Sequence, residues 1–150
     1  MVKFISAILV AIFVVVYIAA QGNDQVPPFL LGAPQNIHAS FEAVIKANAN
    51  KPESEIDKAV EDWVSKQDAS IKTKFGQFKT QVAQMNKEAE AAHNAALAKF
   101  SAEAKAADVQ MSAIAANSGL SPQQKGQQIE AIMKNLKPSV KAEIEQAMQG

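Results

Sequence analysis

The stretch PPFLLGAPQNIHASFEAVI, residues 27–45, decides the fold class of this chain. Pro27 and Pro28 disfavour an α-helix, so residues 21–33 are predicted to form an extended N-terminal segment, within which residues 27–33 are extended or turning. A helix is predicted to start near Pro34, because proline suits the first helical turn. The apolar residues that follow recur at helical spacing and predict one buried face, formed by Ile37, Phe41, Val44 and Ile45.

Proline positions and apolar spacing divide the rest of the chain into further helices. A second helix is predicted from Pro52, and Pro122 and Pro138 start two more. Residues 71–116 contain no proline, and their apolar residues alternate spacings of three and four. This pattern predicts one long helix, and a bend near residues 86–94 is the alternative.

Sustained period-two alternation, which would indicate a strand, is missing from the sequence. The chain is therefore predicted to be all-α: a five-helix bundle with one long central helix, forming a single helical domain over residues 34–150. Phe29, Leu30 and Leu31 in the preceding segment are too apolar to stay in water. We expect these three side chains to dock on the helices.

Residues 1–20 have the features of a signal peptide. Lys3 precedes an apolar run of about 17 residues, which ends before the polar Gln21. A membrane anchor is the alternative, because such a run is at the lower length limit for crossing a bilayer. No cluster of basic residues follows the run, which favours cleavage after Ala20. We therefore expect a secreted, extracellular protein with no stable membrane anchor after cleavage.

The composition excludes several classes of protein. The chain has no cysteine, so its stability must come from apolar burial and not from disulfides. It also has no arginine, and its formal net charge is +0. Arginine is the preferred residue for binding phosphate groups and base edges. We therefore expect no nucleic-acid partner.

Candidate catalytic groups are scarce. His38 lies one turn before Glu42 and is expected to make a surface contact with it. His93 lies near Leu97 on the apolar side of a helix and is expected to be a partly buried structural residue. The sequence contains no Gly-x-Ser-x-Gly, His-Glu-x-x-His or phosphate-binding glycine loop. These observations predict a protein that is not an enzyme.

The candidate metal site is an acidic face on the second predicted helix. Glu53, Asp57 and Glu61 recur every four residues, so the helix stacks three carboxylates on one face. Neighbouring carboxylates raise one another's proton affinity and attract counter-ions. Oxygen ligands suit hard cations, so weak binding of hydrated Mg²⁺ is one hypothesis. A solvated acidic stripe without a metal is the alternative.

Short motifs follow one another in a fixed order: Pro28-Phe29-Leu30, Gly32-Ala33-Pro34, Phe41, Ile45, Glu55-Ile56, Trp63, Lys66-Gln67, Phe75, Phe78, Ile129, Ile132, Leu136 and Val140. Together these motifs resemble the nematode SXP/RAL-2 family. Members of this family are small secreted roundworm proteins, including antigens and food allergens of the Anisakis type. The resemblance covers the chain after residue 20 and implies an all-helical, calmodulin-like, cation-binding domain that host antibodies recognise. The standard calcium-binding loop is missing from this sequence, so the cation expected on the acidic face is Mg²⁺.

The sequence alone leaves two further functions possible. The alanine-rich residues 89–107 would let another helix approach closely, in the protein's own core by default or in a dimer. Alternatively, they would form a groove with residues 29–31 that holds a small apolar ligand. In that case the protein would be a carrier of small hydrophobic ligands. The other function is a structural coiled coil built on residues 71–116.

Overall fold

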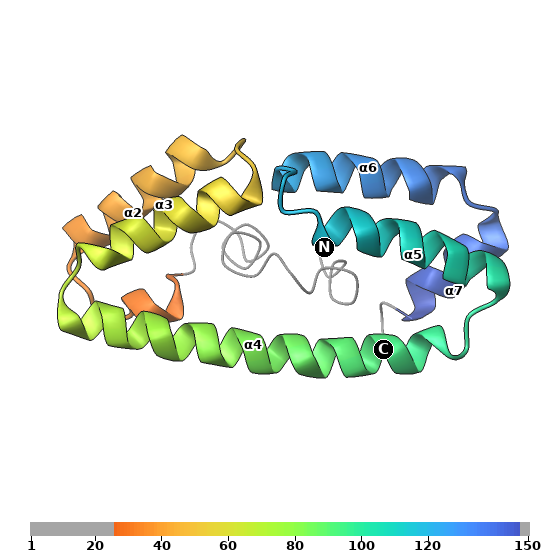
Figure 1. Ribbon diagram of the computed structural model, residues 1–150, viewed down its shortest axis with the longest axis horizontal. Coiled ribbons are helices and arrows are strands. Elements are labelled where there is room, and N and C mark those ends of the chain that lie inside the picture. The colour runs from red at the N-terminus through yellow and green to blue at the C-terminus, as the bar shows by residue number, and fades with distance from the viewer. Residues whose placement is uncertain (1–25, 148–150) are drawn as a thin grey trace.

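The computed structural model describes residues 26–147, and every regular element within them is helical (Figure 1). The signal peptide predicted at residues 1–20 lies outside the described residues. A short 3₁₀-helix precedes six α-helices in this part of the chain. The elements are η1 (Pro28–Leu30), α2 (Gln35–Asn48), α3 (Glu53–Ser65), α4 (Ala69–Leu97), α5 (Ala102–Ala116), α6 (Pro122–Asn135) and α7 (Pro138–Ala147).

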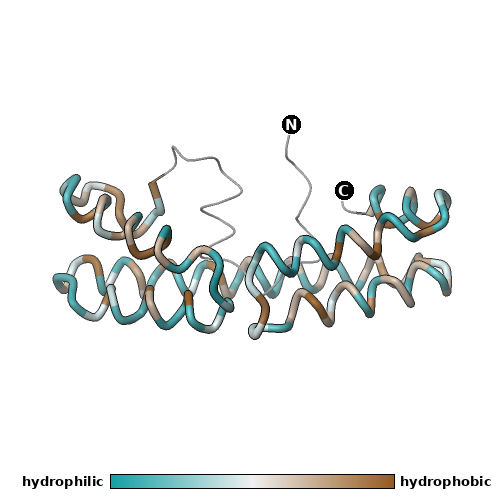
Figure 2. Tube along the Cα trace, turned by 90° about the horizontal axis from the view of Figure 1, so that it is seen from above, coloured by the Kyte–Doolittle hydropathy of each residue, from teal (hydrophilic) through white to brown (hydrophobic). Residues whose placement is uncertain are grey.

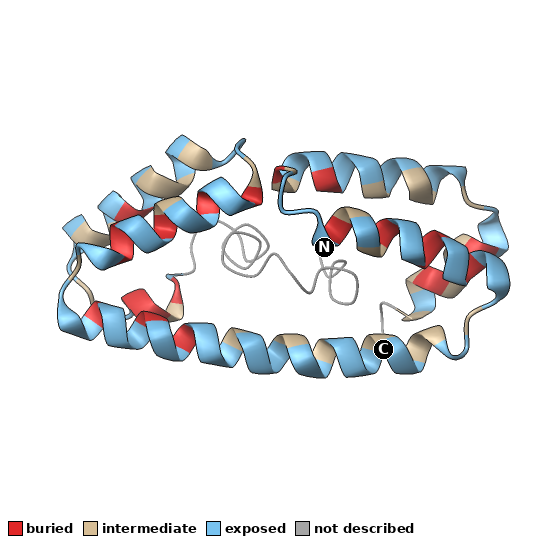
Figure 3. Cartoon of the chain, viewed as in Figure 1, coloured by how far each residue is buried: buried red, intermediate tan, exposed pale blue. Residues whose placement is uncertain are grey.

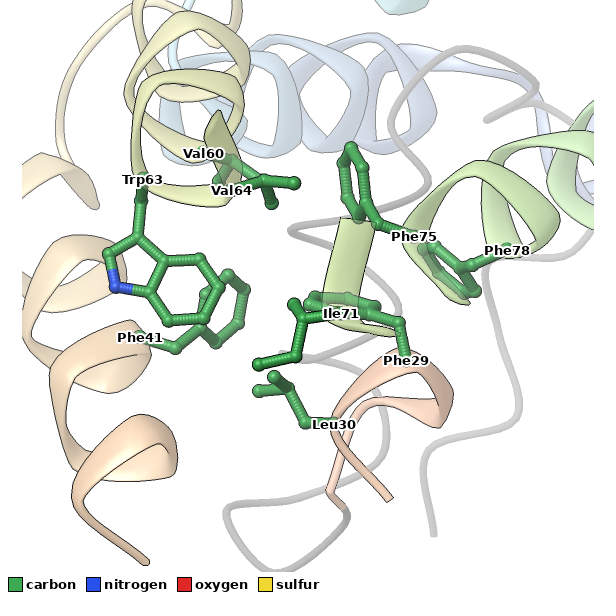
Figure 4. Close-up of a cluster of buried hydrophobic side chains, with 9 residues drawn as sticks. All are labelled: Phe29, Leu30, Phe41, Val60, Trp63, Val64, Ile71, Phe75 and Phe78. Carbon is green, nitrogen blue, oxygen red and sulfur yellow. The ribbon is translucent and has the colours of Figure 1, made fainter. Parts of the chain in front are cut away.

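An aromatic cluster holds together η1, α2, α3 and the first half of α4, which we call the N-terminal group (Figure 4). The Phe29 ring centroid lies 5.3 Å from that of Phe41 and 5.1 Å from that of Phe75. Trp63 packs on Phe41 at 5.1 Å. Such aromatic pairs stabilise by about 0.5–1.5 kcal/mol beyond area burial. The buried members of the cluster are Phe29, Leu30, Phe41, Val60, Trp63, Val64, Ile71, Phe75 and Phe78.

The proline-rich segment is part of this core. Phe29 and Leu30 are each 1% exposed, so their predicted docking is confirmed. Leu31 is 58% exposed, and the prediction is wrong for that residue. Residues 27–33 are predicted to be extended or turning, and within them Pro28–Leu30 form a 3₁₀-turn. Gly32 follows with a φ of +80°, a left-handed conformation that glycine adopts without strain.

Helices α5, α6 and α7 form the C-terminal group around a second apolar cluster. Its buried members come from α5 and α7, with apolar side chains of α6 packed against them. The predicted start of α6 is confirmed by a capping box. Ser121 Oγ accepts from the Gln124 amide at 3.2 Å, and the Ser121 amide donates to Gln124 Oε1 at 2.9 Å. The buried members are Ala104, Ala107, Met111, Val140 and Ile144.

The prediction of one long helix over residues 71–116 is wrong, because α4 ends at Leu97 and α5 begins at Ala102. Ser101 starts α5: its Oγ accepts from the Ala104 amide at 3.2 Å. The Ser101 amide and hydroxyl also donate to the Glu143 carboxylate of α7, at 2.6 and 2.8 Å. These bonds satisfy the new helix end. The bend predicted at residues 86–94 is also wrong, because α4 continues through them.

The two groups lie end to end along α4, which spans both (Figures 1 and 2). Their buried clusters share no residue. Beyond Phe78, the rest of α4 contains no buried residue (Figure 3). The described chain is therefore all-helical, as predicted, but it has six α-helices instead of five. The calmodulin-like arrangement implied by the family resemblance is not confirmed. The coiled-coil hypothesis loses its basis, because residues 71–116 do not form a single helix.

Candidate functional site

Helix α3 places the first of the predicted acidic residues, Glu53, where the two helix groups meet. The Glu53 amide donates to the Leu120 carbonyl at 3.1 Å, and the Ser54 amide donates to the Ser118 carbonyl at 3.2 Å. The first amides of a helix have no partner inside that helix. The loop between α5 and α6 therefore caps the start of α3 across the junction.

Glu53 is buried at this junction and does not line a solvated face. It is 4% exposed, and its carboxylate pairs with the ammonium of Lys125 in α6, which is 1% exposed. Lys125 Nζ also donates to the Ala115 carbonyl of α5 at 2.7 Å. Burial raises the pKa of Glu53, while the hydrogen bond and charge of Lys125 oppose the rise. The expectation of three solvated carboxylates is wrong for this residue.

The other two carboxylates of the acidic face are exposed. Glu61 pairs with Lys79 of α4, with 2.7 Å between Oε1 and Nζ. Asp57 lies between Glu53 and Glu61, one helical turn from each. Although the Asp57 residue is exposed, partial desolvation of its carboxylate raises its pKa, and the charge of Glu61 raises it further. Lys125 and Lys79 oppose this rise.

The acidic face suits only some modes of divalent-cation binding. Among residues 26–147, no group of three or more His, Cys, Asp or Glu side chains is placed to hold a metal ion. Calcium needs six to eight oxygen ligands and does not fit this face. Hydrated Mg²⁺ keeps several waters and uses one or two carboxylates. The exposed carboxylates of Asp57 and Glu61 fit that mode of binding, in which the ion would replace the surface contact of Glu61 with Lys79. Glu53 is buried against Lys125 and is not free to bind a cation.

The histidines are structural in their contacts. His38 Nε2 lies 3.0 Å from the Ala33 carbonyl oxygen, so the contact expected with Glu42 is wrong. The partly buried position of His93 is confirmed: its Nε2 lies 3.1 Å from Oδ2 of the buried Asp108, linking α4 to α5. Ser112 Oγ donates to the same Asp108 oxygen at 3.4 Å. The Asp108 carboxylate therefore lies between His93 and Ser112. In a hydrolase triad the histidine lies between the nucleophile and the carboxylate, so this arrangement is not such a triad.

Lys125 and Asp108 were not predicted to be buried charges, although helical register gives a signal for both. Lys125 precedes Ile129 by four residues and so continues the apolar face of α6 toward its start. Asp108 lies four residues after Ala104, on the buried face of α5. Charged side chains at such positions are almost always paired when they are buried.

The groove expected for a hydrophobic ligand receives no support. Phe29 and Leu30 are buried in the aromatic cluster, and the Phe29 ring packs on Phe75 and Phe78 of α4. The protein's own side chains therefore fill this contact. No helix of residues 26–147 combines the length and the apolar character needed to cross a bilayer.

Fold and site together define an all-helical protein with two apolar clusters joined by a polar, buried junction. The family model described as the metal-binding domain of SXP/RAL-2 family proteins like Ani s 5 matches residues 1–149. The chain belongs to the SXP/RAL-2 family, and the resemblance seen in its motifs is confirmed.

Two relatives are similar over most of their length. The chain is 38% identical over 144 residues to the SXP/RAL-2 family protein Ani s 5 of Anisakis simplex, covering 95% of both chains. It is 40% identical over 124 residues to the OV-17 antigen of Onchocerca volvulus, covering 83% of this chain and 76% of the relative. Neither name states an enzymatic activity. No solved structure matches the chain.

Proposed function

We propose that this chain is a secreted, non-enzymatic nematode antigen and that host antibodies are its partners. The observation that carries the proposal is the 40% identity to the OV-17 antigen of Onchocerca volvulus. The long exposed second half of α4 supports it, because antibodies bind accessible surface and this part of the helix contains no buried residue.

Serum antibodies test the antigen proposal. We expect the folded chain to bind antibodies from nematode-infected hosts well above the level for uninfected hosts in an immunosorbent assay. A heat-unfolded sample serves as the control for conformational epitopes. Equal signals from the two groups of sera would remove the antigen role.

Secretion is tested on the protein recovered from the medium around living worms. N-terminal sequencing is expected to start near Gln21, because the preceding apolar run has the features of a cleaved leader. A recovered chain that still starts at Met1 would contradict cleavage.

Weak binding of a divalent cation is a second candidate function, and the printed description of the matching family model favours it. Among the described residues, Asp57 forms no ion pair or side-chain hydrogen bond. Partial desolvation raises its pKa, and the charge of the nearby Glu61 raises it further. A hydrated Mg²⁺ ion would relieve the repulsion between these two carboxylates. Asp57 and Glu61 would carry the ion, which would replace the surface contact of Glu61 with Lys79. Glu53, at the end of the face, stays paired with Lys125.

Calorimetric titration tests the cation proposal. Mg²⁺ at millimolar concentration is expected to give saturable heat that is lost in the double variant Asp57→Asn with Glu61→Gln. Glu88→Gln is the matched control, because Glu88 is also an exposed helical carboxylate but lies on α4. Absence of heat with the wild-type chain, or retained heat in the double variant, would reject this site.

A further inference from the structure

Lys125 has the environment of a bound cation. Its side chain is 1% exposed, although lysine is almost never fully buried unless it is paired. Its ammonium contacts the Glu53 carboxylate and lies 2.7 Å from the Ala115 carbonyl oxygen. A carboxylate and a backbone carbonyl are the oxygen ligands that proteins offer to hard cations. The lysine ammonium thus occupies an oxygen-lined position inside the fold.

The ligands of this ammonium come from both helix groups. Glu53 opens α3 in the N-terminal group, Ala115 lies in the last turn of α5, and Lys125 is in α6. The two apolar clusters share no residue, so burial of one cluster does not by itself hold the other in place. The contact of Lys125 with Glu53 lies beside the amide bonds from α3 to the α5–α6 loop.

We propose that Glu53 and Ala115 form a cation site at the junction of the helix groups, and that the chain fills it with its own ammonium, Lys125. The internal cation clamps α3 to α5 and α6. The site takes a primary alkylammonium ion when the lysine side chain is removed. This inference is independent of Mg²⁺ binding, which uses Asp57 and Glu61.

The charges around the site agree with a contact that removes both the Glu53 carboxylate and the Lys125 ammonium from water. Burial opposes ionisation of Glu53 and raises its pKa, and the hydrogen bond and charge of Lys125 counter this. The charge of Asp57, one turn along α3, also raises the pKa of Glu53. A buried pair of this kind contributes little net stability, but removal of one partner is strongly destabilising, because the other charge stays buried alone.

Chemical rescue tests the proposal. Lys125→Ala leaves a space that matches n-propylammonium, and it is expected to lower Tm by on the order of 10 °C. Propylammonium at ~100 mM is expected to raise the Tm of this variant by about 3 °C more than that of Lys134→Ala. Lys134 is the matched control, since it lies on the same helix with a side chain that is 70% exposed.

Neutral n-propanol at the same concentration separates charge from cavity filling. The proposal requires rescue by propylammonium and not by propanol. Equal rescue by both would show an apolar cavity, and rescue by neither would show no ligand site, so either result overturns the proposal.

Lysine acylation provides a measurement that does not depend on the folding of Lys125→Ala. In the wild-type chain, limited acetylation followed by mass spectrometry is expected to modify Lys125 at least about tenfold more slowly than Lys134, because the buried ammonium is inaccessible. Glu53→Gln is expected to speed modification of Lys125 and leave Lys134 unchanged. Equal rates at the two lysines in the wild-type chain would overturn the clamp.

Discussion

Trp63 ties α3 to α2 through both its ring and its nitrogen. The residue is 8% exposed, its ring packs on Phe41, and its Nε1 donates to Ser40 Oγ at 3.1 Å. We expect Trp63→Ala to lower the free energy of unfolding by about 3–5 kcal/mol, as is usual for deletion of a large core side chain. Chemical denaturation followed by circular dichroism measures the change.

The control for this deletion is Leu31→Ala, which removes an apolar side chain that is 58% exposed. Its cost is expected to be about 0.5 kcal/mol or less, because surface substitutions rarely exceed that value. A cost below about 1 kcal/mol for Trp63→Ala would contradict the aromatic cluster as the core of the N-terminal group.

Asp57 gives a prediction that depends on pH. Its folded-state pKa is raised above the usual value of 3.8, so the ionised carboxylate costs stability in the folded chain. That cost is absent below the unfolded-state pKa, builds up as the pH rises from the unfolded-state to the folded-state pKa, and is complete above the folded-state pKa. Asp57→Asn is therefore expected to be more stable than wild type at neutral pH, by about 0.5 kcal/mol or less because the residue is exposed.

The same comparison at about pH 3 is expected to show no difference between Asp57→Asn and wild type, because Asp57 is then largely protonated in both states. Thermal unfolding of both chains at neutral pH and at about pH 3 measures the two stability differences. A variant that is less stable than wild type at neutral pH would show that the Asp57 carboxylate stabilises the fold.

At the scale of a helix, Ser101 decides where the long apolar pattern is interrupted. Its hydroxyl caps α5, and both its amide and hydroxyl donate to Glu143. Ser101→Ala removes the cap and is expected to cost about 1–2 kcal/mol, measured by urea denaturation. The exposed Ser54 supplies the control Ser54→Ala, which is expected to be within about 0.5 kcal/mol of wild type. Equal costs for the two variants would contradict this account of the α4–α5 turn.

Helix starts that carry a proline were predictable from the sequence, and the break between α4 and α5 was not. Pro52, Pro122 and Pro138 each lie at the start of an observed helix. The break at residues 98–101 contains neither proline nor glycine, so its local signal is only Ser101 followed by the acidic Glu103. The bond from Ser101 to Glu143 depends on a residue 42 positions away, which local patterns do not contain.

The carboxylates of the candidate site could be predicted from the sequence, but the partner of Glu53 could not. Glu53 lies three residues before Ile56 and seven before Val60, so helical register places it on the buried face of α3. Four residues make slightly more than one helical turn, so Asp57 and Glu61 lie progressively further from that buried face. The partner of Glu53 is Lys125, 72 residues away, and only the tertiary fold brings the two together.

At the scale of the whole molecule, polar contacts among residues 26–147 hold the C-terminal group in place. Glu53 meets Lys125 between α3 of the N-terminal group and α6, and His93 in the second half of α4 meets Asp108 of α5. Glu53→Gln is expected to lower the free energy of unfolding by about 2–3 kcal/mol, because Lys125 loses its counter-charge while it stays buried. Urea denaturation monitored by Trp63 fluorescence measures this change.

Glu103→Gln is the control for that variant, because Glu103 pairs with Lys137 with both side chains exposed. Its cost is expected to be about 0.5 kcal/mol or less. Glu53→Gln at the same low cost would show that the charge on Glu53 is not needed at the junction.

Hydrogen exchange of the wild-type chain tests the junction most directly. The first amides of a helix normally exchange fast, because they have no partner inside that helix. We predict slow exchange for the Glu53 and Ser54 amides, which donate to Leu120 and Ser118 across the junction. The first-turn amides of α2, at Gln35 and Asn36, are the internal reference and are expected to exchange fast. Exchange at Glu53 and Ser54 as fast as at this reference would contradict the joining of the two helix groups.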